Sequence, residues 1–245
     1  MSSAITNSHT TASTTPDRRR LLITGLVLIA AFAIFGLLIS LNVNHPFVQG
    51  MDDAWRRMVG AAPGAENILP SVFFQQLGML LGMVIYVLII PGVLFAVRRW
   101  RTALFVLASM VGTTVVAQLA KNLVDRPRPA ADEAAGLFGP LVQVDHGSFP
   151  SGHAVTMGFI IVATAALIPA TRRWIWWIAG ILLGAGMVWQ RTFINAHWLS
   201  DTFAGLACGI GVTLILWWAF YPLLDKDRGR PLRRTRTTTT ELGAS

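Results

Sequence analysis

The sequence predicts an all-α, polytopic membrane protein with six transmembrane helices. The 245-residue chain is 53% hydrophobic and only 13% charged, whereas soluble globular domains carry about 25% charged residues. Its apolar residues gather in six long runs, and a helix needs roughly 20 such residues to cross a bilayer. Helices are expected because a single span can satisfy its own backbone hydrogen bonds in lipid only as a helix.

The first apolar run covers residues 21–41 and follows three consecutive arginines at 18–20. A cleavable signal peptide is an alternative, because the segment 31–33 (Ala-Phe-Ala) resembles a cleavage site. The uninterrupted run is longer than the apolar core of a signal peptide, which favours a retained span. Residues 1–17 are rich in Ser and Thr and are predicted to form a disordered cytoplasmic tail.

The chain continues with further apolar runs, and the fifth is short but can extend towards Phe193. These runs cover residues 73–97, 102–120, 152–170, 174–189 and 199–224. The last stretch, 225–245, is polar and rich in arginine, which predicts a second disordered cytoplasmic tail. Residues 18–224 are therefore predicted to form one membrane domain.

The distribution of Lys and Arg predicts the orientation. Of the 20 basic residues, 14 fall on one side of the predicted spans, and the positive-inside rule places that side and both termini in the cytoplasm. A basic chain can also bind nucleic acid, but no basic stripe with interleaved aromatic residues is present. The single cysteine, Cys208, excludes a disulfide framework and a thiolate metal site. The six cations on the outer side are Arg56, Arg57, Lys121, Arg126, Arg128 and Arg191.

One polar cluster precedes the last apolar run and contains Arg191, His197 and Asp201. If a helix continues through it, His197 and Asp201 lie four residues apart on one face, where the carboxylate can orient the imidazole as a nucleophile or base. Arg191 offers a planar guanidinium suited to phosphate. A purely structural His–Asp hydrogen bond is the alternative when this cluster is considered alone.

A second cluster, at the end of the third run, contains Lys121, Arg126 and Arg128. Both arginines precede proline, so we expect extended backbone that points one side chain into a site and the other towards solvent or lipid headgroups. A basic stop-transfer signal is the alternative, but it would belong on the cytoplasmic side.

A third cluster, Ser151, Gly152 and His153, opens the fourth run. Ser and Gly at a helix start can simply cap the helix, but a helix N-terminus also binds anions. His153 would then lie beside a bound anion and could protonate a departing oxygen.

All three clusters are predicted to meet at the extracytoplasmic surface. Lys121, Arg128 and Arg191 would neutralise a phosphoryl group beside two histidines and one carboxylate. Phosphoryl transfer depends mainly on positioning and charge stabilisation, and these residues provide both without a metal or other cofactor.

The three clusters, in this order and with this internal spacing, resemble the signature motifs of the type-2 phosphatidic acid phosphatase family, which includes vanadium haloperoxidases. The resemblance implies the helical bundle of that family. It also implies that His197 is the nucleophile, Asp201 its partner and His153 the general acid. The phosphate would be held by Lys121, Arg128, Ser151, Gly152 and Arg191. The chain departs from the family at Gln190, where serine is usual, which bears on substrate preference more than on catalysis.

We therefore expect an integral plasma-membrane lipid phosphatase that acts at the extracytoplasmic face through a phosphohistidine. Candidate substrates are a polyprenyl pyrophosphate such as the undecaprenyl cell-wall carrier, phosphatidylglycerol phosphate and phosphatidic acid. Arg126 receives no catalytic role, but as an extra cation it slightly favours a pyrophosphate. The alternatives are a lipid phosphotransferase with an alcohol acceptor and an anion transporter. No nucleic acid and no obligate protein partner is expected.

Two other groups of polar residues are interpreted as peripheral. Asp145 and His146 are expected to be solvated loop residues near the cluster that contains Ser151 and His153, with contact to a lipid headgroup as the alternative. The pairs Asp52-Asp53 and Arg56-Arg57 are expected to cap and flank a helix at the membrane interface.

Overall fold

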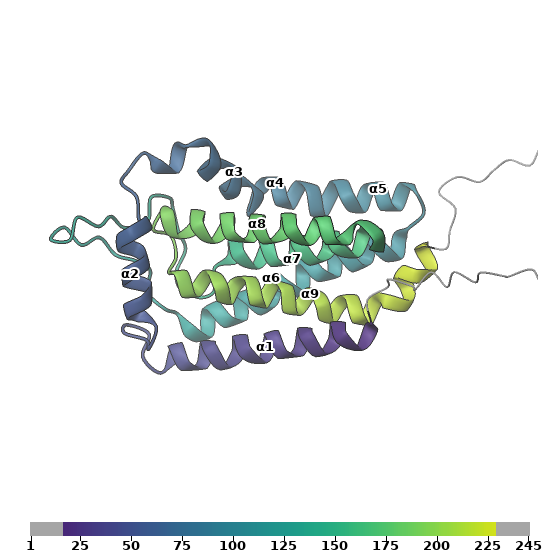
Figure 1. The fold of residues 1–245 in the computed structure, drawn as a ribbon, viewed down its shortest axis with the longest axis horizontal. Helices are drawn as coiled ribbons and strands as arrows, with labels where there is room; N and C mark the ends of the chain where they lie inside the picture. Colours follow the sequence, from purple (N-terminus) through teal and green to yellow (C-terminus); the bar gives the residue numbers. More distant parts are fainter. Residues whose placement is uncertain (1–16, 229–245) are drawn as a thin grey trace, which may run out of the picture.

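The computed structural model describes residues 17–228, in which all regular elements are helices and no β-strand is present (Figure 1). The predicted tail segments 1–16 and 229–245 lie outside the described residues. Every predicted apolar run falls in a helical element. The elements are α1 (Arg18–Ser40), α2 (Gln49–Val59), the 3-10 turn η1 (Ala65–Asn67), α3 (Leu69–Leu77), α4 (Leu80–Met83), the π-helical segment η2 (Val84–Ile89), α5 (Ile90–Ala96), α6 (Trp100–Val124), α7 (Gly152–Leu167), the 3-10 turn η3 (Ala170–Arg172), α8 (Arg173–Phe193) and α9 (Leu199–Arg228).

Fewer than six helices in the described part of the chain are long and apolar enough to count as membrane spans. Among the described residues, α1, α6 and α9 are long and apolar enough to cross a membrane alone. A fourth span is obtained if α3 and the helix that follows it count as one despite a 42° bend. α7 has only 16 residues, and four tryptophans and terminal arginines make α8 less apolar. Six spans therefore remain a prediction.

The bend in the second predicted span lies at Gly78 and Met79, between α3 and α4. A Cβ atom on Gly78 would lie 2.2 Å from the ring of His153 in α7, so only glycine fits there. This long-range contact with His153 is invisible in the local sequence.

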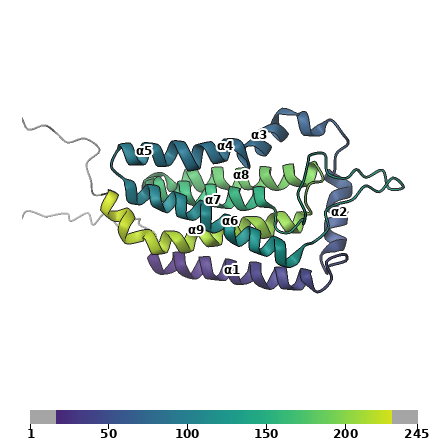
Figure 2. The same ribbon diagram turned by 180° about the vertical axis from the view of Figure 1, so that it is seen from behind.

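The helices form a bundle in which α9 packs against α1, α6 and α7 (Figures 1 and 2). Eleven of the 16 residues of α7 are buried, which explains why this helix is apolar on all sides. Glycines allow α7 and α9 to approach closely: a Cβ atom on Gly209 would lie 2.1 Å from the carbonyl oxygen of Val155. α9 also runs four residues beyond its predicted end, where the buried Asp227 pairs with Arg101 at 3.1 Å.

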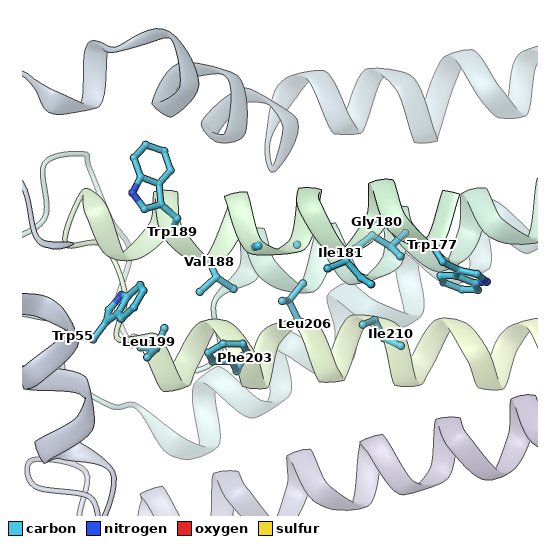
Figure 3. A pocket seen from close by; sticks show the side chains of 13 residues that line it. Trp55, Trp177, Gly180, Ile181, Val188, Trp189, Leu199, Phe203, Leu206 and Ile210 are labelled. Carbon is cyan, nitrogen blue, oxygen red and sulfur yellow. The ribbon is translucent and has the colours of Figure 1, made fainter. Parts of the chain in front are cut away.

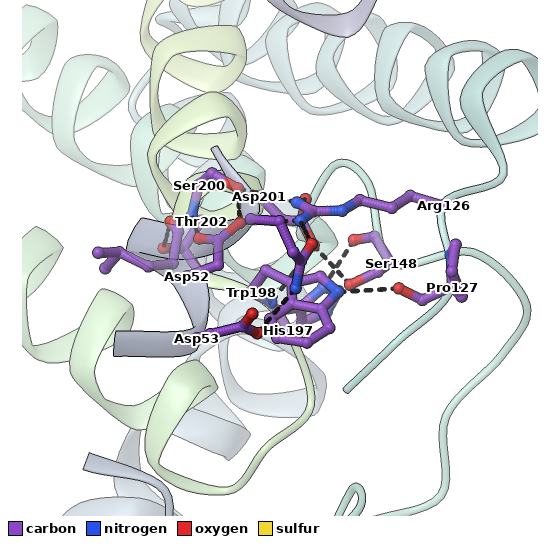
Figure 4. A network of polar contacts seen from close by, with 12 residues as sticks. Asp52, Asp53, Arg126, Pro127, Ser148, His197, Trp198, Ser200, Asp201 and Thr202 are labelled. Atoms are coloured by element: carbon purple, nitrogen blue, oxygen red, sulfur yellow. Dashed lines mark hydrogen bonds and ion pairs between the residues drawn. The ribbon is translucent and has the colours of Figure 1, made fainter. Parts of the chain in front are cut away.

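α2 lies across one end of this bundle (Figure 1), and its location at the membrane interface stays a prediction. A buried ion cluster fixes it there. The guanidinium of Arg126, which is fully buried, donates to Asp52 in α2 and to Asp201 in α9, each at 2.8 Å (Figure 4). Asp52 also accepts hydrogen bonds from the backbone N–H and the hydroxyl of Ser200, at 2.9 and 2.6 Å.

Two expectations about these residues are wrong. Arg126 does not reach solvent, headgroups or a second phosphate, because it is fully buried and its two terminal nitrogens donate to buried carboxylates and to Gln49 and Ser200. Asp52 does not merely flank a surface helix, since it is 1% exposed and neutralises Arg126.

We predict that Asp52→Asn destabilises the protein strongly. Removing one partner of a buried ion pair typically costs about 3 kcal/mol or more. For a chain of this size that corresponds to a thermal midpoint roughly 6–12 °C lower in detergent micelles. The neighbouring Asp53 is only half-buried and bonds Gln49 at 2.9 Å, so Asp53→Asn is the control. Equal shifts for the two variants would show that the ion cluster does not stabilise the bundle.

Candidate active site

His197 lies in a turn and not in a helix. α8 ends at Phe193 and α9 begins at Leu199, and Asn195 between them adopts a left-handed conformation with φ 56°. The expectation that one helix places His197 and Asp201 on a shared face is therefore wrong. The Asp201 carboxylate instead accepts from the backbone N–H of Trp198 at 3.3 Å, which caps the start of α9.

The imidazole of His197 is held by the backbone of another segment. Its Nδ1 lies 2.7 Å from the carbonyl oxygen of Ser148. Because a carbonyl oxygen can only accept, Nδ1 carries the hydrogen and Nε2 keeps its lone pair in the neutral ring. Nε2 lies 3.2 Å from Nη1 of Arg128, which can donate to it. The ring therefore presents an unprotonated nitrogen beside a cation.

Burial lowers the pKa of His197 well below the ordinary value of 6.5, and the charges of Arg191, Arg128 and Lys121 lower it further. The hydrogen bond with the Ser148 backbone works in the opposite direction but is outweighed. The residue is 4% exposed. At neutral pH the ring of the unliganded protein is thus uncharged, as a nitrogen nucleophile must be.

Asp201 does not contact His197 directly, contrary to the expectation that it holds the ring. Its carboxylate accepts from Arg126 at 2.8 Å and from the hydroxyl of Ser148 at 2.5 Å (Figure 4). Ser148 connects the two residues, since its hydroxyl binds Asp201 and its carbonyl binds His197. Asp201 orients the histidine through one intervening residue.

The three cations predicted to hold phosphate, Lys121, Arg128 and Arg191, lie together. They line a cavity of about 440 Å³ with Gly152 and both histidines. We call this the phosphate cavity. Burial lowers the pKa of Arg128, although nearby Asp145 opposes this effect. Arg191 is 2% exposed, donates to Gln75 of α3 and leaves its Nε without a partner in the described part of the chain.

The start of α7 supplies the remaining predicted residues. Ser151 is the N-cap, and its hydroxyl has no hydrogen-bond partner among residues 17–228. Gly152 lines the phosphate cavity with no side chain to block its N–H. Nε2 of His153 is buried, and it also lacks a partner among the residues described. Free donors at a helix N-terminus suit a bound anion.

Gln190, the departure from the family pattern, lies beneath the cavity. Its amide nitrogen is 3.3 Å from the hydroxyl of Ser71 in α3, and its oxygen is 3.5 Å from Nη1 of Arg191. Gln190 therefore supports Arg191 and does not line the phosphate cavity.

Asp145 is a site residue that sequence reasoning missed. Its carboxylate lies 3.0 Å from Nζ of Lys121 and 2.5 Å from Nη2 of Arg128. Burial works to raise the pKa of Asp145, but hydrogen bonds and charges from Lys121 and Arg128 outweigh it, and the net pKa is lowered. The side chain is 59% exposed, as expected of a loop, yet it occupies the cations that would bind phosphate.

Gln75 was missed as well, because the pair Gln75-Gln76 inside an apolar run matches no motif. By contrast, His146 is an exposed loop residue, as predicted, and its Nε2 lies 3.2 Å from Asn122.

Within residues 17–228, no group of three or more His, Cys, Asp or Glu side chains is placed to hold a metal ion.

Comparison with known proteins supports the assignment of the fold. Residues 102–224 match the family model described as the PAP2 superfamily, and all of the predicted site residues lie in this region. The chain is 33% identical over 110 residues to a lipid A 1-phosphatase of Rhizobium johnstonii and 32% identical over 108 residues to one of Rhizobium etli. These alignments cover 43% and 44% of the two relatives, less than half of their length.

Two further similarities cover most of the chain. Phosphatidylglycerophosphatase B of Bacillus subtilis is 20% identical over 186 residues, which are 72% of this chain and 87% of the relative. The crystal structure of a transmembrane PAP2 type phosphatidylglycerolphosphate phosphatase from Bacillus subtilis superposes with a TM-score of 0.64, over 87% of this chain and 99% of that one, at 20% identity. Because the family model covers half of the chain and the fold agrees, this protein belongs to the PAP2 superfamily.

Proposed function

We propose that this protein is an integral membrane lipid phosphatase that works through a phosphohistidine intermediate without a metal ion. The observation that carries the proposal is the hydrogen bond between Nδ1 of His197 and the Ser148 carbonyl oxygen. It leaves Nε2 as the free nitrogen, in a cavity that also contains three cations and His153. The names of the relatives, lipid A 1-phosphatase and phosphatidylglycerophosphatase B, describe removal of phosphate from lipids and agree with this proposal.

In the first chemical step, the Nε2 lone pair of His197 attacks phosphorus. The P–N bond forms as the bond from phosphorus to the leaving oxygen breaks, and that oxygen takes a proton from His153, whose protonated form is stabilised by the negative charge of the bound phosphate. The ring of His153 also hydrogen bonds with the backbone of Gln75, which holds its orientation. Lys121, Arg128 and Arg191 stabilise the negative charge on the other phosphoryl oxygens.

In the second step, water hydrolyses the phosphohistidine. His153, now neutral, takes a proton from the water as its oxygen bonds to phosphorus and the P–N bond breaks. Inorganic phosphate leaves and His197 recovers its lone pair. Asp201 stays ionised and acts through Ser148, stabilising the positive charge that His197 carries while it is phosphorylated.

The substrate phosphate must displace Asp145. In the unliganded protein this carboxylate neutralises Lys121 and Arg128, so these cations are not left as uncompensated charges. A phosphate dianion offers more charge and more oxygens to the same donors. Asp145 then moves away, which its exposed loop position allows.

The substrate range extends over lipid phosphates and pyrophosphates: polyprenyl pyrophosphate, phosphatidylglycerol phosphate and phosphatidic acid. Arg126 no longer favours a pyrophosphate, because it is buried in the ion cluster. A phosphotransferase would differ only in the acceptor of the second step, and product analysis separates it from a hydrolase.

We further propose that the site faces the extracytoplasmic side, on the strength of the uneven distribution of Lys and Arg. Ala135 lies in the exposed loop at the active-site end, and Thr171 is exposed in the connection before α8. In intact cells, a membrane-impermeant thiol reagent should label Ala135→Cys and leave Thr171→Cys unlabelled until the membrane is permeabilised. If only Thr171→Cys were labelled in intact cells, the active-site end would face the cytoplasm and the proposed orientation would be wrong.

The division of labour between the histidines gives a kinetic prediction. In EDTA-containing buffer, His197→Ala should abolish phosphate release from both phosphatidic acid and p-nitrophenyl phosphate. His153→Ala should lower kcat/KM for leaving-group release, which reports the first step, by about 10²–10⁴-fold for phosphatidic acid, because an alkoxide needs the proton, but much less for the aryl phosphate. The control is His146→Ala, since His146 is exposed and outside the phosphate cavity. Equal losses of kcat/KM on both substrates in His153→Ala would remove the general acid from the mechanism.

A further inference from the structure

The phosphate cavity continues into a second hollow of about 250 Å³ between α6 and the start of α7. The two share the lining residues Lys121, Asp145, Gly152 and His153, so a molecule can occupy both. The second hollow is unusual for an apolar bundle, because polar side chains line it below the cations. We call it the threonine groove, after Thr113, Thr114, Gln118 and Thr156.

The position of the threonine groove relates it to the lipid part of a substrate. Thr113 precedes Lys121 by eight residues on α6, which corresponds to roughly 12 Å along the helix axis. Gln118 and Thr114 are exposed and lie between these two levels, so the groove opens to the side of the bundle. A lipid whose phosphate contacts Lys121 therefore places the atoms that follow its phosphate next to these side chains.

The hydrogen-bonding capacity of the groove is incompletely used by the protein. The hydroxyl of Thr113 donates to the carbonyl oxygen of Ser109 at 2.8 Å, and that of Thr114 to Met110 at 2.8 Å. Each hydroxyl can still accept a hydrogen bond from a ligand. The Gln118 amide makes one long contact, 3.4 Å to Asn122, and retains a further N–H for a carbonyl.

Other grooves of the bundle differ in character. A hollow of about 560 Å³ between α8 and α9 is lined by hydrocarbon and aromatic side chains such as Trp177, Ile181 and Phe203 (Figure 3). A hollow of about 490 Å³ between α1 and α6 is similar, with Phe32, Leu119 and Phe149. Hydrocarbon tails suit those surfaces, whereas a purely hydrocarbon segment in the threonine groove would dehydrate its polar groups without replacing their hydrogen bonds.

We infer that the threonine groove selects lipids whose phosphate is followed by an oxygen-rich linker, with ester carbonyls or hydroxyls, over polyprenyl phosphates. Acylated glycerol and acylated sugar phosphates share this chemistry. The inference rests on the proposed function and specifies its substrate class.

The test compares kcat/KM for dioleoyl phosphatidate, an acylated glucosamine 1-phosphate and undecaprenyl phosphate in the same detergent, with p-nitrophenyl phosphate as a substrate that fills only the phosphate cavity. The parent should prefer at least one oxygenated lipid to undecaprenyl phosphate by tenfold or more, and the faster of the two identifies the linker as glycerol or sugar. In the double variant Thr113→Val/Thr156→Val, the ratio of kcat/KM for the preferred oxygenated lipid to kcat/KM for undecaprenyl phosphate should fall about tenfold, because the hydroxyls are lost without a change in shape.

Two controls keep the result interpretable. Thr213 in α9 makes the same backbone hydrogen bond as Thr113, 2.7 Å to Gly209, but lies outside the groove, so Thr213→Val should leave the ratio unchanged. The double variant Thr113→Ser/Thr156→Ser keeps both hydroxyls and should have the same ratio as the parent. A parent that favours undecaprenyl phosphate, or a valine variant with an unchanged ratio, would overturn the inference while leaving the phosphatase activity intact. No phosphate release from any substrate, the aryl phosphate included, would overturn the proposed function and this inference with it.

Discussion

The buried guanidinium of Arg126 is the constraint on which the site depends. A cation without solvent must be neutralised, and here Asp52 from α2 and Asp201 from α9 converge on it. This convergence joins α2, the loop after α6 and the start of α9 in one ion cluster. Asp201 then binds the hydroxyl of Ser148, and the carbonyl of Ser148 fixes the tautomer of His197. The same ion cluster that joins these elements is thus connected to the residue that sets which ring nitrogen of His197, the proposed nucleophile, is unprotonated.

Arg126 and Arg128, which are separated by one proline, have different roles. Arg126 donates from both terminal nitrogens to protein acceptors, whereas Arg128 lines the phosphate cavity and is paired with the exposed carboxylate of Asp145. Extended backbone before each proline sends alternate side chains to opposite sides. One side is the ion cluster and the other is the phosphate cavity. The three residues from Arg126 to Arg128 therefore connect the part of the structure that holds the helices together with the proposed substrate site.

Much of this arrangement could be predicted from the sequence, and what was missed has a common physical cause. The apolar runs predicted the helices, because span length and composition are local properties. Lys121, Arg128, His153, Arg191 and His197 were predicted together, and the structure places them around one cavity. The roles of Asp145, Gln75 and Asp52 were missed because their partners lie 17 to 116 positions away in the chain. The direct His197–Asp201 contact was wrong because the helix breaks at Asn195, which spacing alone does not reveal.

The central claim is that Nε2 of His197 is the nucleophile because Nδ1 is held by the Ser148 carbonyl. The most direct measurement is to quench the enzyme during turnover, under alkaline conditions that preserve phosphohistidine, and to locate the phosphoryl group by mass spectrometry and ³¹P NMR. The account predicts phosphate on His197, bonded to Nε2. Phosphate on Nδ1 of His197, or on His153, would contradict it.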